Sequence, residues 1–438
     1  MYYLKWILTR FIFLKRVMFE LINRALYQEE SRYLVQAWSA KISPFKSTLF
    51  YSFIGRILWS TKEFFALLLK GRVFKKSISL EGFDTTLDKL QKSYIRGNYH
   101  ILWPKTPMVQ SKTYQLSDDF SQKIANSLKI AEKKESQNFN KTKEWERIAT
   151  AIREQFLYKD NSIKKRNLIN FRSDTKLYEE LFNDQFSYLD KDKPYIKSYL
   201  ESIDLVLEYH RFAKKIDKTL LASISESSAG NNLCVQYRGK RLSHKSLFHS
   251  VVVNDLIKTL PLSELKKGVI LDIGAGYGGL SRMLKFYTPK SCHILLDLPE
   301  TLIMTSYFIK YNFPDAKIAL LNTIEDKLND FNNLTKEYDF IIIPPSILTY
   351  IDSESIDLVI NSVSMGFMQE EYLNFYLKQI NRTLKTGGYF YSLNKEYDDK
   401  WGIGTFNWDF KAEYLTLLYE HNNRFSYPQW LGQKQGKK

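Results

Sequence analysis

The stretch between residues 268 and 287 constrains the fold of this chain more than any other. It reads GVILDIGAGYGGLSRMLKFY: a short apolar run with β-branched residues, then a glycine-rich turn, then apolar residues at helical spacing. An apolar strand followed by such a turn and a helix is typical of the first β-α unit of a parallel sheet. The turn brings backbone N–H groups to the start of the helix, where a nucleotide can bind.

The segments that follow repeat this alternation of strands and helices. Four further apolar runs predict strands at 292–299, 317–322, 339–345 and 356–365. Helices are predicted at 300–313 and 369–385, with a double glycine ending the second helix ahead of a last strand. Apolar strands that alternate with helices indicate a parallel sheet covered on both faces. We therefore predict an α/β fold: a Rossmann-like, doubly wound and mostly parallel sheet, preceded by a helical N-terminal region.

Two classes of ligand fit the glycine-rich turn. Gly274, Gly276 and Gly279 satisfy the G-x-G-x-x-G pattern of dinucleotide-binding proteins. The same turn satisfies an acid-x-G-x-G-x-G pattern that starts at Asp272 and ends at Gly278. A pyrophosphate brings its own negative charge, so a neighbouring carboxylate disfavours it. A carboxylate two residues before the first glycine suits a ligand with a cationic ammonium and sulfonium, which is S-adenosylmethionine.

A second acidic residue is expected at the end of the next strand. Asp297 comes 19 residues after Gly278, and a carboxylate at this place can accept hydrogen bonds from both ribose hydroxyls. The alternative is that Asp297 caps the next helix at Leu298-Pro299. Because Asp272, the glycines and Asp297 fall in one β-α-β frame, we favour the ligand-binding interpretation.

Four sequence elements carry a resemblance to a known family. They are LDIGAGYGGLSRML, LLDLPE, IIIPPS followed by DLVINSVSMGFM, and GGYFYSLNK. With these elements the sequence resembles the class I S-adenosylmethionine-dependent methyltransferases, and among them the bacterial sugar O-methyltransferases. The resemblance covers roughly residues 228–398 and is most specific in the first two elements.

The resemblance implies a class I methyltransferase domain that methylates a sugar hydroxyl of a glycan precursor or glycolipid. The sequence departs from the family pattern at one position. The family has an acidic residue before a methionine in the segment after the strand at 356–365, whereas Phe367 precedes Met368 here. A carboxylate role at that point is therefore in doubt, although Glu370 and Glu371 lie just beyond it.

The Pro-Pro pair separates this chain from methyltransferases that act on nucleobases. Those enzymes carry an Asp/Asn-Pro-Pro-aromatic motif that holds an exocyclic amine, and this sequence has Ile343 and Ser346 at the two diagnostic positions. The prolines are instead expected to form a wall near the adenine. The full set of predicted cofactor-binding residues is Asp272, Gly274, Gly276, Tyr277, Gly278, Asp297, Leu298, Ser346 and Asn361.

A sugar hydroxyl is a poor nucleophile, so a general base or a bound divalent metal should activate it. His244 and His249 lie just ahead of the nucleotide-binding region, where an N-terminal lid would face the cofactor. We predict that one of the two is the base, the alternative being a surface or core histidine. No spacing of His and Asp residues indicates a metal site.

The positive charge of the chain is concentrated at its beginning. Residues 1–76 carry fourteen Lys/Arg against four Asp/Glu, which is +10 of the total of +16. This segment is also rich in aromatic residues, but its apolar runs are too short for a spanning helix. Two interpretations stay open: helices packed on the rest of the protein, or peripheral attachment to an anionic membrane surface. Cys234 and Cys292 are the two cysteines, which excludes a disulfide scaffold and favours the cytoplasm, with any membrane contact at the inner face.

These observations predict four regions and three classes of function. The regions are a basic helical segment at 1–80, a helical cap on the acceptor side at 81–245, an S-adenosylmethionine-binding domain at 246–400 and a C-terminal extension at 401–438. The favoured function is a cytoplasmic S-adenosylmethionine-dependent O-methyltransferase. An RNA methyltransferase is the second hypothesis, supported by the basic segment alone. A non-catalytic nucleotide-fold module recruited to membranes is the third.

Overall fold

The computed structural model of the chain describes most of the region from residue 116 onwards. The described residues are 78–80, 116–135, 143–172, 209, 212–213, 216, 220–221, 224–231, 235–237, 240–260, 265, 267–394, 413–420 and 427–436. The chain divides into two units, one formed by Met1–Trp103, Tyr188–Val206 and Val235–Gly239, and the other by the remaining residues. The basic segment at 1–76, with the helices expected there, lies outside the described residues.

The described part of the first unit is a pair of short strands. Strand β1 (Ile78–Leu80) pairs with β2 (Val235–Tyr237) in antiparallel orientation, with Ile78 opposite Tyr237. In the part of the chain that the structure describes, no helix is long and apolar enough to cross a membrane.

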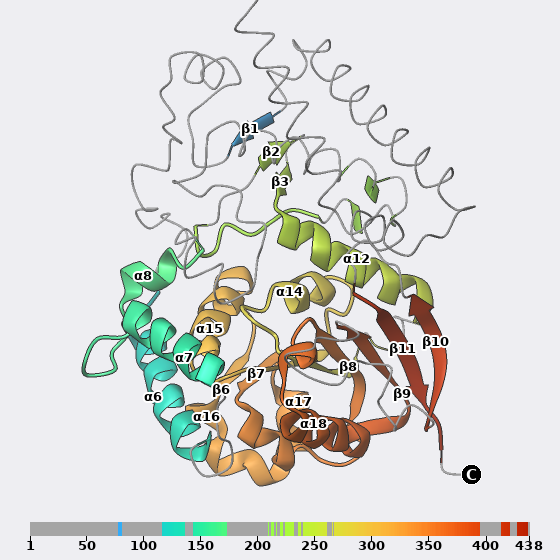
Figure 1. Cartoon of the computed structure of the whole chain (residues 1–438). Coiled ribbons are helices and arrows are strands. Elements are labelled where there is room, and N and C mark those ends of the chain that lie inside the picture. The colour runs from blue at the N-terminus through green and yellow to red at the C-terminus, as the bar shows by residue number, and fades with distance from the viewer. Residues whose placement is uncertain are drawn as a thin grey trace, which may run out of the picture. The chain divides into compact units, whose positions relative to one another are not determined.

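The second unit is built on an eight-stranded sheet with the order β10-β11-β9-β8-β4-β5-β7-β6 (Figure 1). Its parallel strands are β4 (Val269–Ile273), β5 (Cys292–Leu296), β6 (Ile318–Leu320), β7 (Phe340–Ile343), β8 (Ile356–Ser362) and β9 (Leu384–Leu393). The order confirms the predicted mostly parallel, doubly wound sheet. It places β5 on one side of β4 and β8 on the other.

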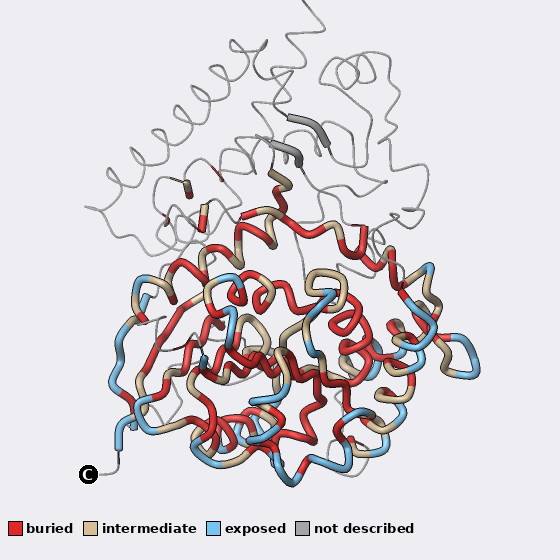
Figure 2. Tube along the Cα trace, turned by 180° about the vertical axis from the view of Figure 1, so that it is seen from behind, coloured by how far each residue is buried: buried red, intermediate tan, exposed pale blue. Residues whose placement is uncertain are grey.

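The central strands are buried on both faces, as their continuous apolar sequences require. Side chains of alternate residues enter two different clusters: Leu295 belongs to one, whereas Ile294 and Leu296 belong to the other. Successive side chains of a strand point to opposite faces, so the two clusters lie on the two sides of the sheet. Figure 2 shows the buried stretches in the interior, with exposed residues at the periphery.

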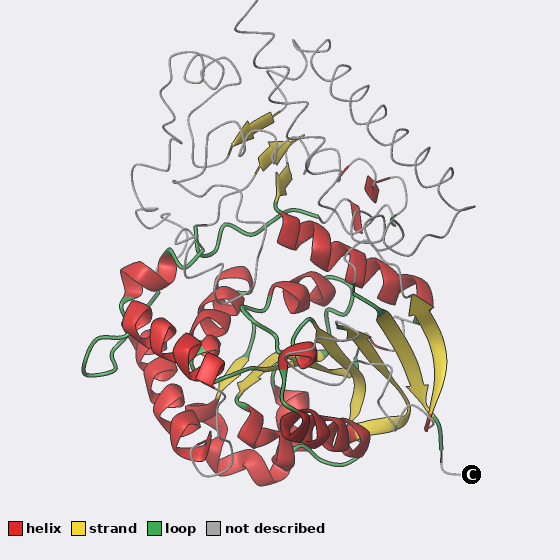
Figure 3. Ribbon diagram, in the orientation of Figure 1, coloured by secondary structure: helices red, strands yellow, loops and turns green. Residues whose placement is uncertain are grey.

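Helices cover both faces of the sheet (Figure 3). One cluster joins α15 (Thr301–Asn312) to three helices from before the core, which are α6 (Asp118–Glu135), α7 (Lys143–Phe156) and α8 (Lys165–Ile169). The other includes residues of α16 (Leu321–Ile324), α17 (Phe331–Glu337) and α18 (Glu370–Thr383). Helix α12 (His244–Thr259) packs against α14 (Gly279–Lys285).

The last parallel strand differs from the prediction at its start. Helix α18 ends at Thr383 and β9 begins at the next residue, before the glycine pair rather than after it. Ile356 pairs with Leu384 but Leu358 pairs with Tyr389, so β9 carries extra residues at this point. Gly387, with a φ of 82°, lies within this irregularity. The glycines therefore permit a bulge inside the strand instead of ending the helix.

The C-terminal region adds two strands that the sequence analysis did not predict. Strand β11 (Gln429–Lys434) pairs antiparallel with β9, and β10 (Tyr414–Glu420) pairs antiparallel with β11. Trp430 is 2% exposed, packs edge-on against Phe390 and donates a hydrogen bond from Nε1 to Thr416 Oγ1 at 3.0 Å. This tryptophan fixes the extension to the sheet. The four predicted region boundaries stay predictions.

Candidate functional site

The glycine-rich turn lies at the carboxyl end of β4, between that strand and α14. Gly274, Gly276 and Gly278 have φ values of 72°, 55° and 88°, which side chains rarely adopt. A Cβ at Gly274 would also overlap the side chain of Ser364. The N–H groups of Gly274 and Ala275 donate to the carbonyl of Leu296 at 2.8 and 3.1 Å, which ties the turn to the end of β5. Backbone conformation and close packing therefore both require glycines in this turn.

Asp272 is the buried acid at the end of β4. It is 2% exposed, and its Oδ2 accepts a hydrogen bond from Ser281 Oγ at 2.8 Å. Burial raises the pKa of Asp272 to about 7, the hydrogen bond from Ser281 opposes this rise, and the neighbouring Asp297 adds to it. The ionised carboxylate is thus costly in the ligand-free protein. A cationic ligand beside it would remove that cost.

Asp297 follows β5 and holds the turn from the other side. Its Oδ2 accepts from the Gly276 N–H and its Oδ1 from the Leu298 N–H, both at 2.7 Å. Burial raises its pKa to about 6, and the two backbone hydrogen bonds counteract this. Leu298 is half-buried beside it. Each carboxylate oxygen can accept a second hydrogen bond, so Asp297 can orient the turn and still receive ribose hydroxyls.

Asp272 and Asn361 mark the point where the strand order reverses. From β4 the chain continues to β5, its neighbour on one side, whereas β8, its neighbour on the other side, is reached only after β7. Open α/β sheets bind ligands in the crevice at such a point. Ile273 at the end of β4 pairs with Asn361 at the end of β8. The predicted site therefore lies where the topology of the sheet favours it.

Asn361 has a different role from the cofactor contact that we predicted. Its side-chain nitrogen donates to the Ile273 carbonyl and to Ser364 Oγ, and its side-chain oxygen accepts from Met365 N–H and from Asn394. The residue is fully buried. All four hydrogen-bonding positions of the amide are used, so Asn361 supports the ends of β4 and β8 and has no position left for a cofactor.

Directly after β8 the chain holds a strained residue. Val363 has a φ of 61°, and its N–H donates to the Leu393 carbonyl at 2.7 Å. A β-branched residue in this region costs on the order of 1–3 kcal/mol and is often found at functional sites. The neighbouring Ser362 Oγ is buried without a hydrogen-bond partner among the described residues. No sequence signal marked the strain at Val363.

Ser346 lies in the turn after β7, next to the Pro-Pro pair. Its N–H donates to Oε1 of Glu135, the last residue of α6, at 2.7 Å. Both residues are buried, and Ser346 Oγ has no hydrogen-bond partner in the described part of the chain. The sequence analysis missed Glu135, because 211 residues separate the two and no local pattern links them.

The two candidate bases lie on α12. His244 is its first residue and is half-exposed. The ring of His249 packs where a Cβ of Gly279 would be, with Cε1 at 2.5 Å from that position. Burial and the charge of Lys245 lower the pKa of His249 to about 3. A base is most effective with a pKa near the working pH, so the surroundings of His249 do not suit that role.

Tyr277 contributes its backbone to the turn and its ring to the packing around it. The ring is 3% exposed and meets Phe308 edge-on at 4.8 Å between centroids. The guanidinium of Arg172 stacks on the ring at 4.7 Å. Its side chain is thus packed within the protein, and its contact with a cofactor stays a prediction.

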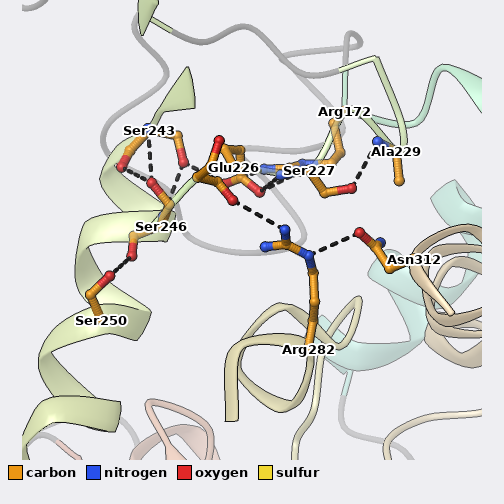
Figure 4. A network of polar contacts seen from close by, with 10 residues as sticks. Arg172, Glu226, Ser227, Ala229, Ser243, Ser246, Ser250, Arg282 and Asn312 are labelled. Atoms are coloured by element: carbon orange, nitrogen blue, oxygen red, sulfur yellow. Dashed lines mark hydrogen bonds and ion pairs between the residues drawn. The ribbon is translucent and has the colours of Figure 1, made fainter. Parts of the chain in front are cut away.

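A buried ion pair links the segment after α8 to the segment before α12, close to the glycine-rich turn (Figure 4). Arg172 binds Glu226 with both terminal nitrogens, at 3.1 and 3.0 Å, and both residues are at most 5% exposed. Glu226 also accepts from the Ser227 N–H at 2.8 Å and from Ser243 Oγ at 2.5 Å. Ser243 is in turn the N-cap of α12. Arg172 and its hydrogen bonds hold the pKa of Glu226 well below its usual range against the effect of burial.

Together these residues bring two buried carboxylates to one glycine-rich turn. Two carboxylates with raised pKa values flank a turn of three left-handed glycines at the switch point of a parallel sheet. The described residues include no group of three His, Cys, Asp or Glu that could hold a metal ion. The fold is a Rossmann-like, doubly wound and mostly parallel α/β fold, as its sheet order shows.

Comparison with known proteins gives structural matches alone. No family model and no curated protein matches this chain. The PH0226 protein from Pyrococcus horikoshii OT3 matches over 41% of this chain and 90% of its own, with 15% identity and a TM-score of 0.29. TYW2 from M. jannaschii, solved with AdoMet, matches over 40% and 73%, with 15% identity and a TM-score of 0.25. YcgJ from Bacillus subtilis matches over 40% and 97%, with 11% identity and a TM-score of 0.28. Similarity at this level carries no argument about function.

Proposed function

We propose that this protein is an S-adenosylmethionine-dependent methyltransferase. The observation that carries the proposal is the pair Asp272 and Asp297 around the glycine turn. Burial raises the pKa of both carboxyls, so the site is prepared to bind a cation. S-adenosylmethionine supplies the sulfonium and ammonium charges and the ribose hydroxyls that these two carboxylates suit.

The same geometry argues against a dinucleotide. The pyrophosphate of NAD would approach the glycine turn, where Asp272 lies and where the ionised form of that residue is already costly. A second anionic group would raise that cost further. The first of the two patterns in the glycine turn is therefore not the functional one.

Calorimetry with S-adenosylmethionine, S-adenosylhomocysteine and NAD tests the proposal. We expect both adenosyl ligands to bind and NAD not to bind. Gly276→Leu should abolish binding, because its φ of 55° and the close approach of ligand to backbone exclude a side chain. Gly436→Leu is the matched control, since Gly436 is exposed and a Cβ there would make only an ordinary contact with Thr386, at 3.6 Å. Tight binding of NAD would overturn the proposal.

We further propose that the acceptor is a sugar hydroxyl of a glycan precursor or glycolipid, on the basis of the resemblance in residues 228–398. In the reaction the acceptor oxygen attacks the methyl carbon in line, the carbon–sulfur bond breaks, and S-adenosylhomocysteine leaves. A base takes the hydroxyl proton. Positioning of the two reactants supplies much of the rate. His244 is the better of the two predicted bases, because the pKa of His249 is about 3.

The other two hypotheses give different results in the same experiments. An RNA methyltransferase would bind RNA with a steep salt dependence, for which the basic segment at 1–76 is the support. A non-catalytic module would fold correctly and fail to bind S-adenosylmethionine.

Mass spectrometry of surface glycans from cells with and without the gene would identify a methylated sugar. Cytoplasmic location is part of this proposal.

A further inference from the structure

A group of four basic residues lies beside the glycine turn. Arg172 follows α8, Arg241 belongs to β3 (Lys240–Leu242), Lys245 lies on α12 and Arg282 lies on α14. We call them the basic group. Arg172 binds Glu226, the Arg241 carbonyl accepts from the Glu226 N–H at 2.8 Å, and Arg282 donates to the carbonyl of the adjacent Ser225 at 3.1 Å. Arg172, Lys245 and Arg282 also act through their charges on the ring of His249. Three parts of the chain, around Arg172, around Arg241 and Lys245, and around Arg282, therefore bring positive charge to one place.

The described carboxylate that acts on this group is Glu226. Both of its oxygens are taken by Arg172, the Ser227 N–H and Ser243 Oγ. Glu226 thus balances Arg172, and no carboxylate in the described part of the chain forms an ion pair with Arg282 or Lys245. Gathering positive charge in a half-buried place is costly unless an anion joins it. The lowered pKa of Arg282, which burial causes, agrees with this cost.

Two members of the basic group can offer donors to a ligand. Arg282 donates from Nε to Asn312 Oδ1 at 2.9 Å and from Nη2 to the Ser225 carbonyl at 3.1 Å. These bonds hold the guanidinium in place (Figure 4), and no hydrogen bond joins its Nη1 to a described residue. Lys245 is half-buried one helical turn before His249 and contacts the ring of Phe248. Arg172 and Arg241 make other contacts and add charge.

The place of the basic group relates it to the proposed reaction. Arg172 stacks on Tyr277 of the glycine turn, and His249 packs on Gly279 where α14 begins. Arg282 lies on that same short helix. An acceptor whose hydroxyl reaches the methyl group can therefore place a neighbouring substituent at the basic group.

We propose that the basic group binds a phosphate of the acceptor, so that the methylated sugar is one linked through a phosphate or diphosphate. This inference rests on the proposed transfer of a methyl group to a sugar hydroxyl. A diphosphate linkage, with one negative charge on each phosphate, matches the positive charge of Arg282 and Lys245 better than a carboxylate with a single charge. The phosphate comes from a nucleotide-linked or a lipid-linked sugar, and both share this chemistry.

Titration of inorganic pyrophosphate into protein saturated with S-adenosylhomocysteine tests the inference. We expect wild-type protein to bind pyrophosphate with an affinity that falls as salt rises. Arg282→Gln and Lys245→Gln should each weaken the binding of pyrophosphate about tenfold or more, which is the usual effect of removing a charged donor. Neither should change the affinity for S-adenosylhomocysteine. Arg282→Lys should retain part of the affinity, and Lys378→Gln, on the exposed surface of α18, should retain all of it.

Two results would overturn the inference. The first is that wild-type protein does not bind pyrophosphate. The second is that Arg282→Gln weakens S-adenosylhomocysteine as much as pyrophosphate, which would assign the basic group to the carboxylate of the cofactor. A thermal melt shows whether Arg282→Gln folds. If it does not fold, the affinity of Lys245→Gln for pyrophosphate tests the inference instead, because Lys245 is only half-buried. Protein that binds pyrophosphate but no adenosyl ligand would refute the proposed function and support the anion site.

A second pair of ligands distinguishes the two sources of the phosphate. UDP that binds more tightly than pyrophosphate would indicate a nucleotide-linked sugar, because the base adds contacts. Geranyl pyrophosphate that binds more tightly would indicate a lipid-linked sugar. Both results support phosphate recognition. If the protein binds pyrophosphate but neither UDP nor geranyl pyrophosphate, the proposal that the phosphate belongs to a larger acceptor is refuted.

Discussion

The raised pKa of Asp272 predicts that cofactor affinity depends on pH. The side chain is 2% exposed, and burial raises its pKa from 3.8 to about 7. One pKa unit corresponds to about 1.36 kcal/mol, so ionising this carboxyl in the ligand-free protein costs on the order of 4 kcal/mol. A bound sulfonium or ammonium favours the ionised form and lowers the pKa. Binding must therefore release a proton wherever Asp272 starts out protonated.

The size of the effect follows from the two ends of the pH range. At pH 8 about one-tenth of ligand-free Asp272 is protonated, and at pH 6 about nine-tenths is. We expect the affinity for S-adenosylmethionine to fall roughly tenfold from pH 8 to pH 6, because the proton competes with the cation. Asp297, with a pKa of about 6, steepens the fall at lower pH. Near pH 7 binding should release about half a proton from Asp272.

Calorimetry between pH 5.5 and 8.5, in buffers that differ in ionisation enthalpy, measures both quantities. Asp272→Asn should bind more weakly at pH 8 and lose the part of the pH dependence that lies near pH 7. Asp357→Asn is the matched control. Its half-buried carboxylate accepts from the Val269 N–H and pairs with Lys385, both at 2.7 Å, near the opposite ends of β4 and β8. It should keep the wild-type profile. A flat wild-type affinity from pH 6 to 8 without proton release would refute the reasoning.

The stability of the ligand-free protein should change in the opposite sense. A carboxyl whose folded pKa exceeds its unfolded value binds more protons in the folded state between those two values. Asp272 therefore stabilises the fold at low pH, and this contribution is lost as the pH rises from about 4 to about 7. Relative to Asp272→Asn, wild-type protein should lose free energy of unfolding over this range in urea titrations. A difference that does not vary with pH would contradict the assigned pKa.

Four further predictions concern other parts of the chain. Asp297→Ala should weaken S-adenosylmethionine by about 1.5–3 kcal/mol, the usual contribution of hydrogen bonds to a charged group, and an unchanged affinity in calorimetry would reduce Asp297 to a capping role. His244→Ala should lower turnover about 10²–10⁴-fold with cofactor affinity preserved. His249→Ala should keep most of the turnover, because the pKa of the His249 ring is about 3. Full turnover in both variants would contradict a histidine base and leave a metal or another acid to activate the hydroxyl. Trp430→Ala should lower the free energy of unfolding by about 3–5 kcal/mol in urea, since the side chain is buried against the sheet, and a loss below about 1 kcal/mol would contradict that packing. Removal of residues 1–76 should release the protein from anionic vesicles in flotation and leave cofactor binding intact, while loss of folding would show that this segment belongs to the core.

The succession of strands and helices around the turn can be read from the amino-acid sequence. The apolar runs that became β4, β5, β7 and β8 are short and continuous, and burial on both faces of a parallel sheet requires that pattern. The glycines and the two acids were identified for the same reason: each stands at a fixed distance from the end of a strand. Chain connectivity alone then places Asp272 and Asp297 at one edge of the sheet.

The properties of the site residues were decided by the tertiary structure. Asn361 was expected to bind a ligand, and its hydrogen bonds to the ends of β4 and β9 occupy it fully. His249 was predicted to be a general base, but burial together with three basic neighbours lowers the pKa of its ring to about 3. Glu135 reaches Ser346 across 211 residues. A pKa or a hydrogen bond depends on every group within a few ångströms, and most of those groups come from distant segments that no local pattern can reveal.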